Sequence, residues 1–334
     1  MKKKYIRLFS HCFVVDGAEN SAVYDFHKGV VLRIPKSFSE VIHQLHVYPV
    51  KKVYQLYIGQ ESTLDEYINY LTTHDLVFFT NTPQLFPRTE IAYKNFSSVA
   101  SAVLEYTGEY SMANLVTELD ILNCKVVELR YLNPLVSINE LEEVLNPFVD
   151  STTRCIELIF STFNGLTKES IYEFVDKNKK IGFIVIAGYH ETEIMFADSC
   201  KIVFTEKPIN KVTTNHYTSP KVVINMDYFM ESHFYNPYYN AKVCIDKAGN
   251  IKNCLSLKKS FGNVNRALLS KAINKDNFKK LWRIKPDKIE SLKDSEFRYA
   301  LYIPNQLKAV KGGSDLYKYT DLSKADFNNL CEKF

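Results

Sequence analysis

Short apolar segments alternate with amphipathic segments across the middle of the 334-residue chain, and this alternation constrains the fold more than any other feature. The apolar segments are continuous, which is typical of strands buried on both faces of a parallel sheet. The amphipathic segments between them predict helices, so the pattern indicates β–α units. We expect an α/β fold, either a partial barrel or a doubly wound sheet. The expected strands are 125–132, 155–161, 181–188, 201–207 and 221–227.

The first 85 residues carry a different pattern and predict a small domain of their own. Two strand-like runs read as a hairpin that turns at 27–29. Pro35 is placed to open a helix, and Ser62 with Asp65 resembles the start of a second helix. A short strand at 75–81 would close the domain. Strands with two or three helices in this length suggest a winged-helix-like module.

The composition changes again after residue 230, where Asn, Tyr and Lys are frequent and long helical patterns are missing. A hairpin is expected around 247–250, and a short helix at the end of the chain. We therefore expect four parts, which are 1–85, 86–230, 231–317 and a C-terminal helix at 318–334.

Charge and hydrophobicity exclude several classes of function. Lys and Arg number 42 against 38 Asp and Glu, a balance that does not favour nucleic-acid binding. The sequence has no apolar run near the roughly 20 residues of a membrane helix. The basic start is followed by an apolar run that Arg7, Ser10 and His11 interrupt, so we expect no signal peptide and a cytoplasmic protein with no membrane partner.

The seven cysteines are an odd number and are scattered, which argues against a disulfide framework. In a reducing compartment each is expected to be a small buried residue. GxGxxG, GxxxxGK[ST], HExxH and GxSxG motifs are absent. His43 and His46 share a predicted helix, but with no third ligand nearby we expect a surface pair and no metal site.

One pair of cysteines has a more specific spacing. Cys244 and Cys254 are separated by nine residues that include Gly249. Iron–sulfur clusters need closely spaced thiolates, so this spacing is the opening half of such a site. About forty residues later comes the segment 292–304, where the closing half would be expected.

These motifs resemble the SPASM domain of the radical S-adenosylmethionine (SAM) peptide maturases, in particular those of grasp-with-spasm systems. The resemblance includes the loop 260–264 and Trp282, and is most specific over 232–300. Upstream, the chain is similar to the peptide-recognition region and the incomplete barrel of the same maturases. The residues that match the SPASM pattern are Cys244, Gly249, Cys254, Asp294, Glu296, Phe297, Arg298 and Tyr299.

The chain departs from this family at the cluster ligands. Four positions at which the family places cysteines are occupied by Leu292, Ser295, Leu301 and Pro304. The CxxxCxxC motif that holds the catalytic cluster of a radical enzyme is absent from the sequence. Two cysteines cannot complete a four-thiolate site, so we expect a pseudo-enzyme with no radical chemistry and no cofactor. Cys244 and Cys254 would be buried remnants, and a salt bridge between Glu296 and Arg298 would hold the loop.

The resemblance implies an accessory protein of ribosomal peptide maturation. Its N-terminal module would bind a precursor peptide by adding a strand to a sheet edge. The other domains would present that peptide to an ATP-grasp ligase. One alternative is an enzyme that keeps an iron–sulfur cluster or another metal at Cys244 and Cys254, with Cys12, Cys331 or His233 as a further ligand. Another is a structural interaction protein with no peptide partner.

Overall fold

The computed structural model describes residues 4–215, 220–311, 315–320, 322 and 324–332. The chain forms two compact units, each built from separated segments. Unit 1 contains Met1–Tyr93, Pro220–Pro237 and Ile284–Phe334. Unit 2 contains Lys94–Ser219 and Tyr238–Arg283. The four-part division expected from the sequence remains a prediction.

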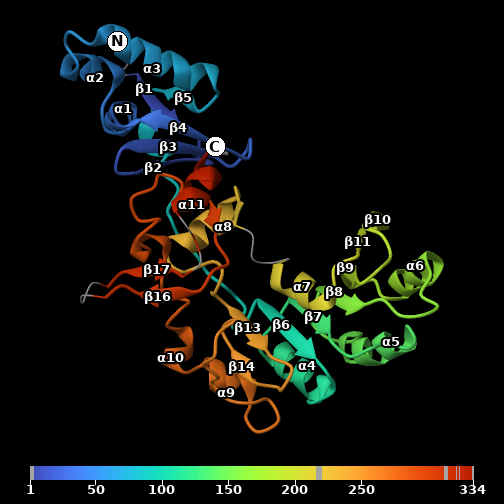
Figure 1. The fold of residues 1–334 in the computed structure, drawn as a ribbon. Helices are drawn as coiled ribbons and strands as arrows, with labels where there is room; N and C mark the ends of the chain where they lie inside the picture. The colour runs from blue at the N-terminus through green and yellow to red at the C-terminus, as the bar shows by residue number, and fades with distance from the viewer. Residues whose placement is uncertain (1–3, 216–219, 312–314, 321, 323, 333–334) are drawn as a thin grey trace. The chain divides into compact units, whose positions relative to one another are not determined.

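Unit 2 is built on an eight-stranded, mostly parallel sheet, which confirms the α/β fold (Figure 1). The strand order is β10-β11-β9-β8-β7-β6-β13-β14, and only the pairs β10–β11 and β13–β14 are antiparallel. The strands are β6 (Ser101–Tyr106), β7 (Val126–Tyr131), β8 (Cys155–Ser161), β9 (Ile181–Ala187), β10 (Glu193–Ala197), β11 (Cys200–Thr205), β13 (Lys242–Ile245) and β14 (Ile251–Lys252).

Four of the five expected strands are present in this sheet, as β7, β8, β9 and β11. The fifth, 221–227, is wrong. Only β12 (Lys221–Val222) is extended there, and it pairs with β15 (Leu301–Tyr302) in unit 1. The side chain of Asn225 then accepts a hydrogen bond from the Tyr228 backbone N–H at 2.8 Å and caps the next helix, which ends the extended run.

Helices lie on both sides of this sheet. Figure 1 shows α4 (Met112–Ile121) and α5 (Asn139–Leu145) on one side and α7 (Ile209–Asn215) on the other. α7 packs Val212 in a cluster with Ile159 and Val185, so it covers part of the sheet face to which those residues point. The remaining helices of unit 2 are α6 (Lys168–Lys177), α9 (Leu269–Ile273) and α10 (Asp276–Lys279). None of the helices described in either unit is long and apolar enough to cross a membrane.

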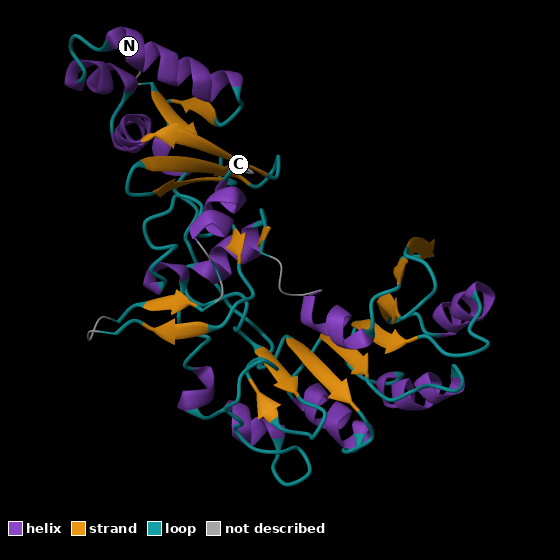
Figure 2. Cartoon of the chain, in the orientation of Figure 1, coloured by secondary structure: helices purple, strands orange, loops and turns teal. Residues whose placement is uncertain are grey.

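The N-terminal part of unit 1 combines two small sheets with three helices (Figure 2). The expected hairpin at 27–29 is confirmed between β3 and β4. The second expected helix is also present, but the expected N-cap at Ser62 with Asp65 in the first turn is wrong. That helix begins at Glu61 after Gln60, and Asp65 accepts a hydrogen bond from the Tyr54 hydroxyl. The elements are β1 (Tyr5–Leu8), β2 (Cys12–Asp16), β3 (Asn20–Asp25), β4 (Val30–Pro35), α1 (Lys36–Val47), α2 (Val50–Leu56), α3 (Glu61–Thr73) and β5 (Val77–Thr80).

The later segments of unit 1 pack against β2 and β3 through aromatic side chains. Phe229 of α8 (Met226–Ser232) is 1% exposed, and its ring centre lies 5.0 Å from Phe13 and 5.1 Å from Tyr24. Its ring also lies 5.7 Å from Tyr299. Phe229 therefore joins three segments that are far apart in the sequence. The other elements of unit 1 are β16 (Leu307–Ala309), β17 (Tyr317–Tyr319) and the expected terminal helix, α11 (Lys324–Cys331).

Candidate functional site

One face of the unit 2 sheet carries charged and thiol side chains. The register places Cys244 beside Val103 and Val103 beside Glu128. Because side chains alternate along a strand, Lys242 shares the face of Cys244, and Arg130 shares the face of Glu128. Glu128 is 6% exposed and Arg130 is 7% exposed. We call this group the inner-face cluster, and it consists of Glu105, Glu128, Arg130, Tyr238, Lys242, Cys244 and Cys254.

The charges of the inner-face cluster are paired. Arg130 Nε donates a hydrogen bond of 2.5 Å to Glu128 Oε1, and Arg130 Nη1 lies 3.9 Å from Glu105 Oε1. Burial raises the pKa of Glu128, and the Arg130 guanidinium opposes this shift. The Lys242 ammonium lies 3.3 Å from the centre of the Tyr238 ring, a cation–π contact. Sequence analysis missed these charges, although two charged residues within an apolar strand were a usable signal.

The two cysteines of the β13–β14 hairpin differ in their surroundings. Burial raises the pKa of Cys244 to about 12. Burial also raises the pKa of Cys254, but the Lys242 charge and hydrogen bonds from the Ser256 and Tyr238 hydroxyls outweigh it and lower that pKa overall. Cys254 Sγ lies 3.1 Å from the Tyr238 hydroxyl and 3.2 Å from Ser256 Oγ. Of the two thiols, Cys254 has the greater thiolate character.

Gly249 is a turn residue of this hairpin. Its φ of +81° is in the left-handed region, and its backbone N–H donates to the Asp246 carbonyl at 2.8 Å. A Cβ at this position would lie 3.2 Å from Val264 Cγ2. The Asp246 carboxylate closes the turn, accepting from the Asn250 backbone N–H at 2.9 Å and pairing with Lys252 at 2.9 Å. The glycine in the motif is therefore explained by the geometry of the turn.

The second half of the motif lies in unit 1, and the expected salt bridge between Glu296 and Arg298 is wrong. Glu296 Oε1 accepts from Arg33 Nε at 2.8 Å, and its backbone carbonyl accepts from the Tyr24 hydroxyl at 2.9 Å. Arg298 Nη1 donates to the Asp16 carbonyl at 2.9 Å. Both residues thus bind partners in the N-terminal sheet, which lie more than 200 positions away in the sequence.

Other residues of the motif also make contacts within unit 1. The Asp294 carbonyl accepts from the Ala18 backbone N–H at 2.8 Å. Phe297 is fully buried, and the Arg33 guanidinium lies 4.6 Å from its ring centre. The Tyr299 hydroxyl donates to Asp287 Oδ1 at 2.7 Å. In unit 1 this part of the motif holds the N-terminal sheet.

The four positions at which the family places cysteines are filled by packing and turn residues. Leu292 is 1% exposed, Leu301 is 3% exposed, and Pro304 is buried. Ser295 Oγ accepts from the Phe297 backbone N–H at 3.1 Å, a local turn contact. These positions belong to unit 1, whereas the two hairpin cysteines belong to unit 2. The motif that reads as one domain in the sequence is divided between the two compact units.

The further ligands considered for a retained cluster, Cys12, His233 and Cys331, also belong to unit 1. Among the residues that the structure describes, one group of three has ligand atoms close enough to share a metal ion, and it contains neither hairpin cysteine. That group is His11, Cys12 and Asp25. Sequence analysis missed His11 and Asp25, because the antiparallel register that brings Asp25 opposite Cys12 is a property of the folded sheet.

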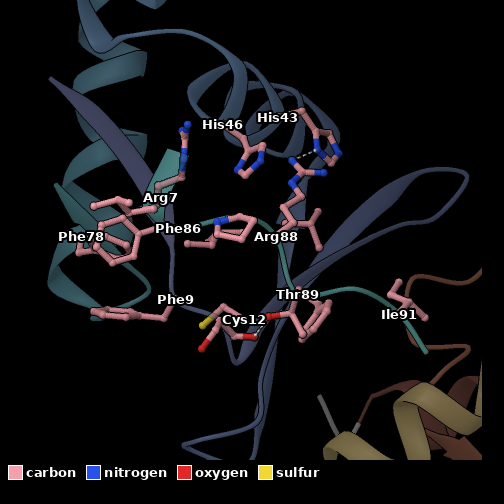
Figure 3. Close-up of a pocket in the computed structure, with 16 residues that line it drawn as sticks. Arg7, Phe9, Cys12, His43, His46, Phe78, Phe86, Arg88, Thr89 and Ile91 are labelled. Carbon is pink, nitrogen blue, oxygen red and sulfur yellow. Dashed lines mark hydrogen bonds between the residues drawn. The ribbon is translucent and has the colours of Figure 1, made fainter. Parts of the chain in front are cut away.

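A groove of about 640 Å³ opens in the N-terminal part of unit 1 (Figure 3). We call it the N-terminal groove. β1, the start of β2, α1 and the segment 85–91 line it. Its apolar side is aromatic, since the Phe78 ring lies 5.3 Å from Phe9 and 4.8 Å from Phe86. Sequence analysis did not identify these residues as a site.

The polar side of the N-terminal groove is basic. Arg7 is 8% exposed and donates through Nη1 to the Leu45 carbonyl at 3.2 Å, while its buried Nε has no hydrogen-bond partner. Arg88 Nη2 lies 3.5 Å from His43 Nδ1. Burial and the nearby Arg88 charge lower the pKa of His46 to about 4, so that side chain is neutral at pH 7. The groove can therefore accept a carboxylate beside large apolar groups.

Comparisons with known proteins assign no family. No protein-family model and no curated protein matches the chain. Among solved structures, the SuiB protein of Streptococcus suis bound to S-adenosylmethionine aligns with 88% of this chain and 94% of its own. The sequence identity is 10% and the TM-score is 0.31, a loose likeness that identifies neither activity nor ligand.

Proposed function

We propose that this protein is a peptide-binding accessory protein of ribosomal peptide maturation, active in the cytoplasm without radical chemistry. Its N-terminal segment is a winged-helix-like module that binds a precursor peptide. Its remaining parts correspond to a partial barrel and a degenerate SPASM-like domain, and they present the peptide to an ATP-grasp ligase. The N-terminal groove is the observation that carries this proposal.

The groove offers both elements of peptide recognition. Among the described residues, β2 pairs with β3 alone, so its other edge has no strand partner. At the ends of that edge the Cys12 N–H donates to the Phe9 carbonyl and the Asp16 carbonyl accepts from Arg298, so an added strand would pair around Val14. Phe13 and Val14 of β2 line the groove, which places that edge at the groove wall. Main-chain hydrogen bonds to such an edge supply affinity, and side-chain pockets supply selectivity. A peptide laid along β2 would enter the aromatic part of the groove.

Charge complementarity defines the class of peptide. Arg88 is exposed, and Arg7 keeps a buried Nε without a hydrogen-bond partner. A carboxylate in the groove would form charge-assisted hydrogen bonds with the exposed Arg88 guanidinium, and the buried Arg7 charge would attract it. The rings of Phe9, Phe78 and Phe86 favour a large apolar neighbour. The expected ligand is thus an extended peptide with Asp or Glu next to a large apolar residue.

The order of the parallel strands in the unit 2 sheet supports the proposed partial barrel. β6, β7, β8, β9 and β11 are neighbours in chain order, and all of these pairs are parallel. A barrel continues in one direction, as this run does from β6 to β11, whereas a doubly wound sheet reverses its strand order at a switch point. β13 departs from the run, because it joins the other side of β6. We infer a partial barrel that serves as a scaffold.

Selection from a displayed random peptide library tests the proposal. We expect the selected peptides to carry Asp or Glu beside a large apolar residue, and to bind the full chain at micromolar concentration by fluorescence anisotropy. Replacing Arg88→Glu reverses a charge at the groove and should weaken binding about tenfold or more, since hydrogen bonds to charged groups contribute about 1.5–3 kcal/mol. Titration of one selected peptide against both proteins measures this.

Arg154→Glu is the matched control, because it makes the same change of charge at an exposed residue of unit 2. This variant should bind the peptide like the parent protein. A library without acidic enrichment, or an equal effect of both substitutions, would show that the groove is not the peptide site.

A second candidate is a metal- or iron–sulfur-dependent peptide-modifying enzyme at the hairpin cysteines. The observation that favours it is the thiolate character of Cys254, which Lys242, Ser256 and Tyr238 support. A thiolate is both a metal ligand and a nucleophile. Near-stoichiometric iron and sulfide in anaerobically purified protein would favour this enzyme, while iron-free protein would leave the peptide-binding role.

A further inference from the structure

We propose that His11, Cys12 and Asp25 form a zinc-binding site in unit 1, separate from the hairpin cysteines. The backbone positions all three residues. Cys12 opens β2 and stands opposite Asp25, the last residue of β3, in the antiparallel register. His11 precedes Cys12, and its carbonyl accepts from the Phe26 backbone N–H at 3.2 Å. Because Cys12 and Asp25 stand directly opposite each other, their side chains lie on the same face of the sheet. The His11 ring approaches them from the turn that precedes β2.

The donor atoms are already close to one another. The ring nitrogen of His11, the sulfur of Cys12 and a carboxylate oxygen of Asp25 all lie within 4.8 Å of each other. His11 Nε2 lies 3.6 Å from Asp25 Oδ1. In a tetrahedral zinc site the metal–ligand distances place neighbouring donors about 3.3–3.8 Å apart. Small rotations of the His11, Cys12 and Asp25 side chains would bring the three donor atoms to that separation.

The Asp25 carboxylate points independently to a cation. Asp25 is fully buried. Its Oδ1 accepts from the backbone N–H groups of His27 at 3.0 Å and Lys28 at 3.1 Å, whereas its buried Oδ2 has no hydrogen-bond partner. A buried carboxylate oxygen without a partner costs free energy. A metal ion bound to Oδ2 would remove this cost.

The chemistry of the donors selects zinc. Imidazole, thiolate and carboxylate together suit a borderline-soft ion, whereas calcium and magnesium prefer oxygen alone. His27 lies beside the group, with its ring centre 5.3 Å from that of His11, and its exposed side chain would have to rotate to supply a fourth ligand. The nearby Lys28 ammonium is held elsewhere, by the His74 carbonyl at 2.6 Å and Asp75 at 3.7 Å.

Cobalt titration of the chelator-treated full chain tests this site. Co²⁺ replaces zinc and reports a thiolate ligand through a charge-transfer band. We expect one Co²⁺ per chain with that band, displaced by Zn²⁺. His11→Gln should weaken cobalt binding at least about tenfold, by analogy with the loss from altered supporting residues. His11 is only half-buried, so this variant should fold, as circular dichroism can verify.

Two control variants locate the thiolate. Cys12→Ser should abolish the charge-transfer band, while Cys254→Ser should leave it unchanged. The titration contains no peptide, so its result is independent of the proposed peptide binding. A parent protein that binds no cobalt at micromolar concentration would overturn the site. So would an undiminished affinity in His11→Gln, or a band that disappears in Cys254→Ser.

Discussion

Phe229→Ala is expected to lower the free energy of unfolding of unit 1 by about 3–5 kcal/mol, the usual cost of removing a buried phenylalanine. The Phe229 ring is 1% exposed and contacts rings from β2, β3 and residue 299. Its removal opens a cavity at the point where three distant segments meet. Hydrogen exchange measured by mass spectrometry should show β3 amides exchanging at least about 100-fold faster.

Phe234→Ala is the matched control for this experiment. Phe234 follows the same helix but is 44% exposed, so the same truncation removes little buried surface. Its exchange pattern should resemble that of the parent protein. Equal protection of β3 in Phe229→Ala and the parent would show that the aromatic cluster does not hold these segments together.

The parts of the fold that were predicted from the sequence are those whose pattern is local. The strands β7, β8, β9 and β11 are mostly apolar runs, interrupted at Glu128, Arg130 and Glu157, as expected of strands whose two faces are largely covered. The β3–β4 hairpin has its turn at 27–29, and Gly29 takes a φ of +66° there. Each of these elements depends on residues that are close in the sequence.

The strand predictions that failed did so because of contacts that the apolar pattern does not show. The run 221–227 is apolar enough for a strand, but the Asn225 side chain caps a helix and stops it. β6 (Ser101–Tyr106) was not among the expected strands, and its place in the sheet comes from pairing with β7 and β13. The strand propensity of a segment does not indicate which distant strands it pairs with.

The candidate sites were harder to predict than the fold. The resemblance singled out Glu296 and Arg298, yet their partners are Arg33 and the Asp16 carbonyl in the N-terminal sheet. Alternating aromatic and charged residues indicate a half-buried segment, but they do not indicate what it packs against. The same limit applies to Asp25, because its proposed role as a metal ligand depends on its register with Cys12.

Glu128→Ala is expected to lower the free energy of unfolding of unit 2 by up to about 3–5 kcal/mol, the cost of breaking a buried ion pair, because it removes the nearer anion of Arg130 and leaves the weaker contact with Glu105 at 3.9 Å. Arg130 is 7% exposed and hydrogen-bonds Glu128 at 2.5 Å. Lys242 would lose the same anion, which acts to raise its pKa. Urea unfolding followed by the fluorescence of Trp282, the one tryptophan of the sequence and a residue of unit 2, measures the change.

A second substitution separates the lost ion pair from the lost packing. Replacing Glu128→Leu together with Arg130→Met removes both charges, and this double variant should be more stable than Glu128→Ala, since apolar replacement of a buried pair is often neutral. Glu142→Ala is the control, because in its pair with Lys177 the side chains are 34% and 66% exposed, and surface pairs contribute about 0–1 kcal/mol. If Glu128→Ala were no more destabilising than Glu142→Ala, the inner-face cluster would be open to water rather than buried.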